Sequence, residues 1–276
     1  MSNQAIGVFD SGYGGLTVLK SLRKALPDMN FIYLGDNARA PYGTKSYEEV
    51  YAYTLQAVKW FFNKDCPLVI LACNTASAKA LRTIQQNDLP NLDPNKRVLG
   101  VIRPSAEVIG EYTTTRHIGI LGTPGTVNSS SYLLEVEKFF PDLIVVQNAC
   151  TNWVKLIEDQ NYDAENIEQD VKNELEKTLQ KDSELDVLLL ACTHYPLLLS
   201  VIEKQLPAHI KVISQGDIVA DKLVDYLERH LEINKLLASD AKIEFYTTGI
   251  PQEFNKQASL FYEENIEALH AKIDFL

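Results

Sequence analysis

The stretch VILACNT at residues 69–75 returns as LLLACTH at residues 188–194. Two other landmarks return in the same order: IGVF at residues 6–9 as IGIL at 118–121, and FIYL at 31–34 as LIVV at 143–146. The separations are 119, 112 and 112 residues, respectively. Three matches in series, at nearly the same spacing, indicate that the chain contains a duplicated unit.

The repeated pieces belong to a series of short runs rich in Val, Ile and Leu, which alternate with longer segments of helical periodicity. Continuous apolar runs of this length are typical of strands buried on both faces, and hence of parallel sheets covered by helices. The sequence therefore predicts an α/β fold with two similar three-layer α/β domains and mainly parallel sheets. The expected strands are 6–9, 31–34, 68–72, 98–102, 118–121, 143–146, 187–191, 211–213 and 243–246.

The repeat also predicts how the chain is divided. The second domain would span residues 98–211, and the first would combine residues 1–97 with residues 212–276, which have no counterpart in the repeat. Two such domains pack most simply about a pseudo-twofold axis, with the carboxyl ends of their strands facing a shared cleft, where open α/β sheets bind ligands. Since Cys73 and Cys192 each end an expected strand, we expect one cysteine on each wall of that cleft.

Charge and composition exclude several classes of partner. The formal net charge is −11 with scattered acidic residues, which argues against nucleic acid or a membrane surface because phosphate binding needs a basic face. No apolar run approaches the roughly 18 residues of a transmembrane helix, and no signal segment is expected before the first strand. We therefore expect a cytoplasmic protein with four reduced cysteines, of which Cys66 and Cys150 serve packing.

Two facing thiols suit the inversion of a carbon that bears an acidic hydrogen. One base must remove the proton from one face, and a separate acid must return a proton to the other. A thiolate and a thiol can fill these roles and exchange them, since the pKa of free cysteine, roughly 8.5, lies near neutrality. Asp10, at the level of Cys73, and His194, beside Cys192, could hold or accept a proton. Either could instead be structural, Asp10 as a helix cap.

Polar residues at the expected strand-to-helix turns could bind substrate carboxylates, because helix N-termini offer free backbone N–H groups to anions. These residues are Ser11, Asn74, Thr75, Thr126 and Thr193. Pro41, Tyr42 and Gly43 follow the second expected strand and could add a backbone edge and a hydroxyl, although Tyr42 could equally be a packing aromatic.

Motifs for common cofactors are absent. Residues 12–15, GYGG, look like a dinucleotide-binding loop, but Thr17 stands where GxGxxG requires its third glycine. The chain has no Walker A, HExxH or GxSxG sequence, and Cys192 with His194 lacks the further ligands of a structural zinc site. Pyridoxal phosphate has no general sequence signature, but apart from Lys45 no lysine lies near an expected strand end, where it could hold this cofactor. We therefore expect neither a cofactor nor a metal.

Four motifs resemble those of the bacterial glutamate racemases, in the aspartate/glutamate racemase superfamily. They are FDSGYGG at residues 9–15, GDNARAPYG at 35–43, ACNTAS at 72–77 and ACTHYP at 191–196. The resemblance implies a cofactor-independent isomerase that supplies D-glutamate for peptidoglycan by a two-base mechanism. It further implies that the enzyme is cytoplasmic, commonly as a homodimer, with glutamate as its small-molecule substrate.

The resemblance also implies roles for individual residues. Cys73 would work on D-glutamate and Cys192 on L-glutamate, assisted by Asp10 and His194. Glu158, which follows the motif ACTNWV at residues 149–154, would be a further carboxylate near the second cysteine. That motif departs from the family pattern at Thr151, where proline is usual, and Ser105 stands where glycine is more common. The substrate-binding positions would be Asp10, Ser11, Tyr42, Gly43, Asn74, Thr75, Thr193 and His194.

Two other interpretations remain open at this level. A related two-cysteine racemase or isomerase acting on aspartate, a hydantoin or maleate would share the fold. A non-catalytic amino-acid sensor or regulator of another protein would bind its ligand even without the two cysteines. Turnover tests with each substrate separate these interpretations.

Overall fold

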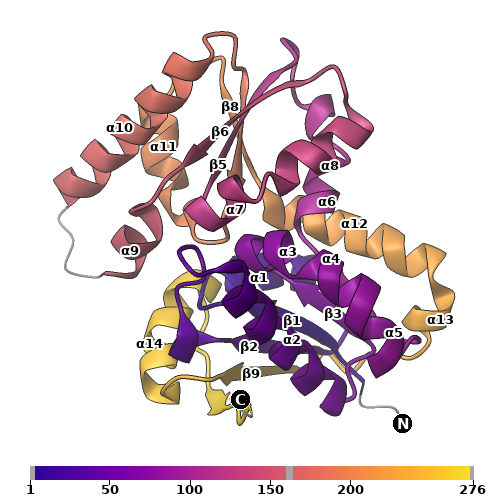
Figure 1. Cartoon of the computed structure of the whole chain (residues 1–276). Coiled ribbons are helices and arrows are strands. Elements are labelled where there is room, and N and C mark those ends of the chain that lie inside the picture. The colour runs from indigo at the N-terminus through magenta and orange to yellow at the C-terminus, as the bar shows by residue number, and fades with distance from the viewer. Residues whose placement is uncertain (1–3, 160–163, 274–276) are drawn as a thin grey trace.

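The computed structural model describes residues 4–159 and 164–273 of the chain. Within these two ranges ten strands form two sheets, and all neighbouring strands run parallel. The sheets lie in two lobes, each with helices packed around its sheet (Figure 1). The α/β class with parallel sheets, predicted from the apolar runs, is confirmed.

The first sheet has six strands, which are β1 (Ile6–Asp10), β2 (Phe31–Gly35), β3 (Leu68–Leu71), β4 (Arg97–Gly100), β9 (Ile243–Thr247) and β10 (Ala268–His270). They lie in the order β10-β9-β2-β1-β3-β4. The central strands β1, β2 and β3 are buried along their whole length. Alternate side chains of each strand enter two different apolar layers, so the strand appears as a continuous apolar run in the sequence.

The second sheet has four strands, which are β5 (His117–Gly122), β6 (Ile144–Ala149), β7 (Val187–Ala191) and β8 (Lys211–Ser214). Their order is β6-β5-β7-β8, which repeats the order β2-β1-β3-β4 of the first sheet. The duplication read from three sequence landmarks therefore extends to a four-stranded unit. In the first sheet β9 and β10 continue beyond β2.

Two details differ from the sequence expectation. The run at 98–102, assigned to the second domain, forms β4 and pairs with β3 of the first sheet, whereas β8 pairs with β7 of the second. By strand pairing the chain passes between the two sheets after Gly100 and after Ser214. The division into residues 98–211 and the remainder of the chain stays a prediction. Strand β10 was not predicted, because three residues at a sheet edge carry too little apolar pattern.

Helices cover both faces of each sheet. The helices are α1 (Gly15–Ala25), α2 (Tyr47–Asn63), α3 (Asn74–Lys79), α4 (Leu81–Thr83), α5 (Leu89–Leu92), α6 (Ile102–Ala106), α7 (Pro124–Asn128), α8 (Ser131–Phe139), α9 (Trp153–Glu158), α10 (Ala164–Lys181), α11 (Leu199–Gln205), α12 (Gln215–Arg229), α13 (Leu231–Asn234) and α14 (Pro251–Tyr262), with short turns of other helix types at Asn37–Arg39, Ile84–Asp88, Ile109–Glu111 and Tyr195–Leu198. On the first sheet α1, α12 and α14 pack on one face and α2 with α3 on the other. On the second, α9, α10 and α11 face α6 and α8 across the sheet.

The two passages between the lobes lie close together. After β4 the chain enters α6, and after β8 it enters α12, which packs against both α6 and α1. In Figure 1 the long helix α12 lies between the two lobes. At its beginning, Asp217 Oδ1 accepts a hydrogen bond from Ser21 Oγ of α1 at 2.8 Å. The first and second lobes are thus joined through a shared helical layer beside the strand ends.

Candidate active site

The carboxyl ends of the two sheets face each other across the junction of the lobes. Thr193, after β7, donates from Oγ1 to Asp10 Oδ2 at the end of β1 (3.2 Å). Thr17 of α1 donates from Oγ1 to the Thr193 carbonyl at 3.0 Å. Further along, the Gly125 N–H donates to the Gly43 carbonyl at 2.8 Å. Because parallel strands all end on the same side of their sheet, these contacts bring the predicted polar residues of both lobes together.

Cys73 lies on the first wall, directly after β3. It is the N-cap of α3, and its Sγ accepts a hydrogen bond from Ala76 N at 3.4 Å. The thiol is 3.5 Å from Ser11 Oγ, to which it donates. Burial and the nearby Asp10 carboxylate raise the pKa of Cys73 to about 12, although the hydrogen bonds with Ser11 and Ala76 act in the opposite direction. Cys73 is therefore a neutral thiol at neutral pH.

Cys192 lies on the second wall, directly after β7, with a different set of partners. His194 forms a hydrogen bond with Cys192, and its Nε2 lies 2.7 Å from Glu158 Oε1 at the end of α9. Burial lowers the pKa of His194, but the hydrogen bonds and charges of Cys192 and Glu158 outweigh burial and raise the pKa to about 10. The imidazole is therefore positively charged at neutral pH. The edge of its ring packs against Phe261 of α14, with centroids 5.2 Å apart.

Asp10 lies between the two walls and is fully buried. Its Oδ1 accepts from Gly12 N at 2.9 Å. Burial raises the pKa of the Asp10 carboxyl, while the charge of His194 and the bonds from Gly12 and Thr193 act in the opposite direction. Asp10 thus has contacts with the first wall through Gly12 and with the second wall through Thr193.

The two thiols belong to one site. Cys192 makes a small contribution to the raised pKa of Cys73, so the two thiols lie within electrostatic range of each other. Both are almost completely buried, at 5% exposure for Cys73 and 6% for Cys192. The walls are therefore closed over the thiols in this conformation.

A cluster of threonines joins the walls beside the thiols. Thr75 Oγ1 lies 2.9 Å from Thr123 Oγ1 and 3.4 Å from Thr126 Oγ1. Thr75 and Thr126 were predicted as site residues, but Thr123 was not. Thr123 caps α7, because its Oγ1 accepts a hydrogen bond from Thr126 N at 3.3 Å. The repeat contained the signal, because Thr123 holds the position after β5 that Ser11 holds after β1.

The predicted segment at residues 41–43 is only partly directed toward the thiols. Tyr42 is buried and donates its hydroxyl to Asp36 Oδ2, while Thr248 donates to Asp36 Oδ1 at 2.7 Å. The Tyr42 hydroxyl is therefore engaged by a carboxylate of its own lobe. Gly43 reaches the second lobe through its carbonyl, whereas Pro41, after a cis peptide bond, is exposed.

Gly14 allows the two walls to approach each other closely. This role of Gly14 was not predicted from the sequence. A Cβ atom at this position would lie 2.3 Å from both His194 Nδ1 and Thr193 Oγ1. The GYGG sequence at residues 12–15 was considered only as a failed dinucleotide loop, yet its second glycine permits contact with the other lobe. Asn74 was predicted, but its two buried partners, Gln215 and Tyr132, were not.

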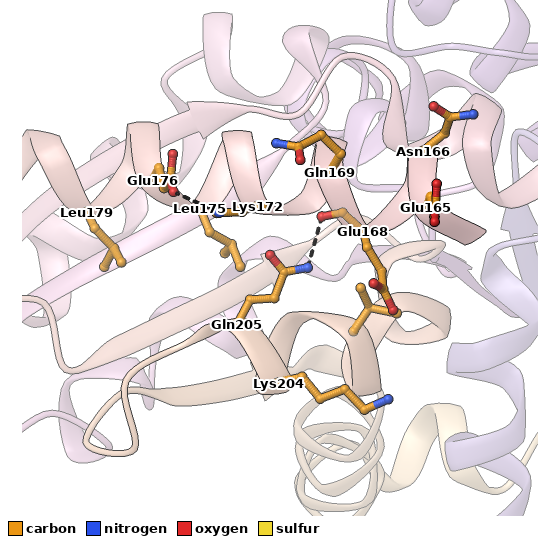
Figure 2. Close-up of a pocket in the computed structure, with 11 residues that line it drawn as sticks. Glu165, Asn166, Glu168, Gln169, Lys172, Leu175, Glu176, Leu179, Lys204 and Gln205 are labelled. Atoms are coloured by element: carbon orange, nitrogen blue, oxygen red, sulfur yellow. Dashed lines mark hydrogen bonds and ion pairs between the residues drawn. The ribbon is translucent and has the colours of Figure 1, made fainter. Parts of the chain in front are cut away.

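Cavities lie elsewhere on the molecule. One of about 830 Å³ lies between α10 and α11, where Gln205 Nε2 donates to the Glu168 carbonyl at 2.9 Å (Figure 2). Another of about 520 Å³ is bordered by Tyr13, Asn37 and other residues of the first lobe. Neither is bordered by the two candidate catalytic cysteines.

The other two cysteines lie away from the junction of the lobes. Cys66 and Cys150 are buried in apolar clusters, as expected for packing residues, and burial raises the pKa of each thiol. Among residues 4–159 and 164–273, no group of three or more His, Cys, Asp or Glu side chains is arranged to hold a metal ion. In the same ranges no helix is long and apolar enough to span a membrane.

Comparison with known proteins gives consistent results. A family model described as Asp/Glu/Hydantoin racemase matches residues 6–223. The glutamate racemase of Roseobacter denitrificans is 39% identical over 273 aligned residues, covering 95% of this chain and 98% of that protein. The structure of a glutamate racemase isoform from Bacillus anthracis has a TM-score of 0.87 at 34% identity, covering 99% of this chain and 98% of that one. For the Francisella tularensis glutamate racemase in complex with D-glutamate, the TM-score is 0.85 at 32% identity, covering 100% and 98%.

Proposed function

Because the chain belongs to the Asp/Glu/Hydantoin racemase family, we propose that it interconverts L- and D-glutamate by proton transfer at the α-carbon between Cys73 and Cys192. The observation that supports this most strongly is the placement of the two thiols. They follow β3 and β7, which hold equivalent positions in the two sheets, and they interact electrostatically across one closed junction. Two bases on opposite sides of one carbon are what inversion requires.

The charges of the site suit a reaction that starts from L-glutamate. The positively charged His194 lies beside Cys192, whereas Cys73 is a neutral thiol. The Cys192 thiolate removes the α-proton, so that an S–H bond forms as the C–H bond breaks. The Cys73 thiol then donates its proton to the opposite face of the carbanion, which yields D-glutamate and a Cys73 thiolate. The reverse reaction runs through the same steps with the roles exchanged, and no cofactor takes part.

The polar residues around the thiols would assist these transfers. Glu158 holds the imidazolium form of His194. Asp10, whose charge acts on Cys73, would accept or return a proton on the other wall. Burial excludes water, which strengthens the interaction of fixed dipoles with the charge of the carbanion. The groups proposed to bind the two substrate carboxylates and the ammonium are Asp10, Ser11, Tyr42, Gly43, Asn74, Thr75, Thr126, Thr193 and His194, with Pro41 in the adjoining segment.

Substrate entry requires the lobes to separate. Glutamate cannot reach thiols that are 5% and 6% exposed unless the contacts between the walls open. The two neighbouring passages between the lobes, at α6 and α12, provide the place where such a movement would occur. Closure then removes water from the reacting atoms.

The proposal extends to the cellular role. The motif resemblance supports a cytoplasmic enzyme that supplies D-glutamate for peptidoglycan and acts as a homodimer, with neither nucleic acid nor membrane as a partner. Growth of a D-glutamate auxotroph carrying the gene tests the role, and light scattering of the purified protein tests the assembly. Failure to restore growth or a monomer at working concentration contradicts the corresponding part.

The activity itself is tested by incubating the protein with L-glutamate in D2O without added cofactor. Circular dichroism should decay to zero while deuterium enters the α-position. Cys73→Ser and Cys192→Ser should each abolish the decay, whereas Cys66→Ala, a matched change at a buried thiol outside the junction, should not. Absence of both decay and exchange in the parent protein would refute the proposal, and decay with aspartate but not glutamate would replace the substrate.

A further inference from the structure

A network of four buried polar side chains lies where the lobes meet, directly beside Cys73. Its members are at most 4% exposed and are Asn74, Ser105, Tyr132 and Gln215. Gln215 accepts from Asn74 Nδ2 through Oε1 at 2.7 Å. Its Nε2, which has two hydrogens, shares them among three acceptors: Ser105 Oγ at 2.8 Å, the Tyr132 hydroxyl at 2.6 Å and, at the longer distance of 3.2 Å, the Val101 carbonyl. The Tyr132 hydroxyl in turn donates to Asn74 Oδ1 at 2.7 Å.

The four residues come from segments that are far apart in the sequence. Asn74 begins α3 of the first lobe, immediately after Cys73, and Tyr132 lies on α8 of the second lobe. Ser105 lies on α6, where the chain first passes between the lobes, and Gln215 begins α12, where it returns. The network therefore connects the residue beside a thiol with both passages.

The direction of every hydrogen bond in the network is determined by one main-chain group. The Val101 carbonyl can only accept, so the Gln215 amide must turn its Nε2 toward it and toward Ser105, whose hydroxyl also donates to Val101 O at 3.1 Å. Oε1 of Gln215 must then face Asn74 Nδ2, and the Tyr132 hydroxyl, which accepts from Gln215, donates to Asn74 Oδ1. The Asn74 amide is thereby held in one of its two orientations.

We infer that Gln215 is a positioning residue that orients the Asn74 amide toward the substrate and couples this orientation to closure of the lobes. Asn74 Nδ2 carries two hydrogens, and Gln215 takes one, which leaves the other for a substrate carboxylate. With the amide reversed, an oxygen would face that carboxylate and repel it. Because Gln215 lies at the passage into α12, opening the lobes would release Asn74, and closing them would restore its orientation. This inference rests on the proposed racemisation of glutamate.

The first test removes hydrogen-bonding atoms from the network by substitutions that keep the side-chain volume similar. Gln215→Leu and Tyr132→Phe should each lower kcat/KM about 10-fold or more, chiefly by raising KM, because a buried amide that loses its partner binds its ligand less well. Two matched changes should stay within about 2-fold of the parent enzyme: Gln85→Leu, whose amide donates to the Val98 carbonyl, and Tyr51→Phe, whose hydroxyl donates to Asp88. Thermal unfolding of each variant shows that it is folded.

Gln215→Glu separates orientation from packing. A protonated carboxyl can accept from Asn74 and donate toward Val101 as the amide does, whereas a carboxylate can only accept. The ratio of variant to parent kcat/KM should therefore fall as pH rises through the pKa of the new carboxyl. A structural role alone would give a ratio that does not change with pH. Parent-like KM in Gln215→Leu, or a pH-independent ratio in Gln215→Glu, would overturn the inference.

A readout without turnover distinguishes this inference from the proposed function. In the NMR spectrum the Asn74 side-chain amide, assigned with Asn74→Asp, should exchange slowly with solvent in the parent protein and faster by at least about 10-fold in Gln215→Leu. If the parent protein fails to racemise glutamate, the proposed function is wrong. If the Asn74 amide exchanges equally in both proteins, the positioning role is wrong whatever the activity.

Discussion

The walls that carry Cys73 and Cys192 occupy equivalent positions in two sheets of the same strand order, but their neighbours differ in charge. The Cys73 thiol has a hydroxyl, a backbone N–H and the Asp10 carboxylate around it. Cys192 has the imidazole of His194, which Glu158 holds at 2.7 Å. An adjacent negative charge favours the neutral thiol, whereas an adjacent positive charge favours the thiolate.

The difference shows how a duplicated unit can serve a reaction that needs two unlike partners. Duplication provides a thiol on each wall, but the charged neighbours differ, with Asp10 near Cys73 and His194 paired with Glu158 beside Cys192. Glu158 comes from α9 and reaches the second wall only through the packing of the second lobe. On the proposed mechanism, the second wall removes the proton from L-glutamate and the first wall returns one.

The largest expected effect divides the reaction into its two halves. In D2O, Cys73→Ser should lose at least about 10³-fold of the racemisation rate but still exchange the α-proton of L-glutamate, because Cys192 can remove a proton and return a deuteron on the same face. Cys192→Ser should show the mirror behaviour with D-glutamate. Proton NMR of each enantiomer measures the exchange. Equal exchange of both enantiomers in either variant would show that the walls do not have the roles assigned here.

His194→Asn tests the charge of the second wall. Loss of the imidazolium should lower kcat/KM by about 10²-fold, since the thiolate on Cys192 loses its stabilising partner. The equilibrium constant between enantiomers is unity, so kcat/KM must fall equally in both directions. The asymmetry should appear in solvent exchange, with that of L-glutamate slowed more than that of D-glutamate. The reverse order of exchange would reverse the assignment of the two walls.

The same histidine predicts how stability depends on pH. Its pKa is raised from 6.5 to about 10 in the folded protein, so the folded state holds a proton that the unfolded state releases between these values. The stabilisation is complete below pH 6.5 and is lost as pH rises toward about 10. The difference in unfolding free energy between the parent and His194→Asn should therefore shrink over this interval, as denaturant titrations at several pH values would show. A difference that grows with pH would mean that the buried imidazole is neutral.

Gly14→Ala tests the fit of one wall against the other. The added methyl group would overlap His194 and Thr193, with 2.3 Å to the nearest atoms of each, so the walls must move apart. We expect a loss of roughly 10-fold to 100-fold in kcat/KM. Gly122→Ala is the matched control, because its methyl group would meet no atom nearer than 3.5 Å. Comparable losses in both variants would show that tight contact at Gly14 is not required.

The smallest expected effect concerns the threonine cluster. Thr123→Val keeps the side-chain shape but removes the hydroxyl that contacts Thr75 at 2.9 Å across the junction. A decrease of roughly 3-fold to 10-fold in kcat/KM is expected, which corresponds to the loss of one or two hydrogen bonds. Thr54→Val, at a buried threonine that bonds within α2, serves as the control. An unchanged kcat/KM in Thr123→Val would remove the cluster from the site.

Much of the fold was predictable because its signal is local. Nine apolar runs became nine of the ten strands in the described ranges, since a strand buried on both faces is apolar at every position. The repeat predicted the second unit. The same repeat aligns Thr123 with Ser11, although Thr123 was not predicted as a site residue. β4 and β8 are equivalent strands, one in each sheet, and the division into domains at residues 98 and 211 stays a prediction.

The amino-acid sequence by itself determined the α/β class, the duplication and the position of a cysteine after an equivalent strand in each half. These features depend on periodicity and on residues close together in the chain. Only the tertiary structure showed that His194 contacts Glu158 and that Gln215 holds Asn74, residues that are 36 and 141 positions apart. Such contacts depend on how the lobes pack and where the chain passes between them. The apolar pattern of a sequence indicates that a side chain is buried, but it does not indicate which distant residue packs against it.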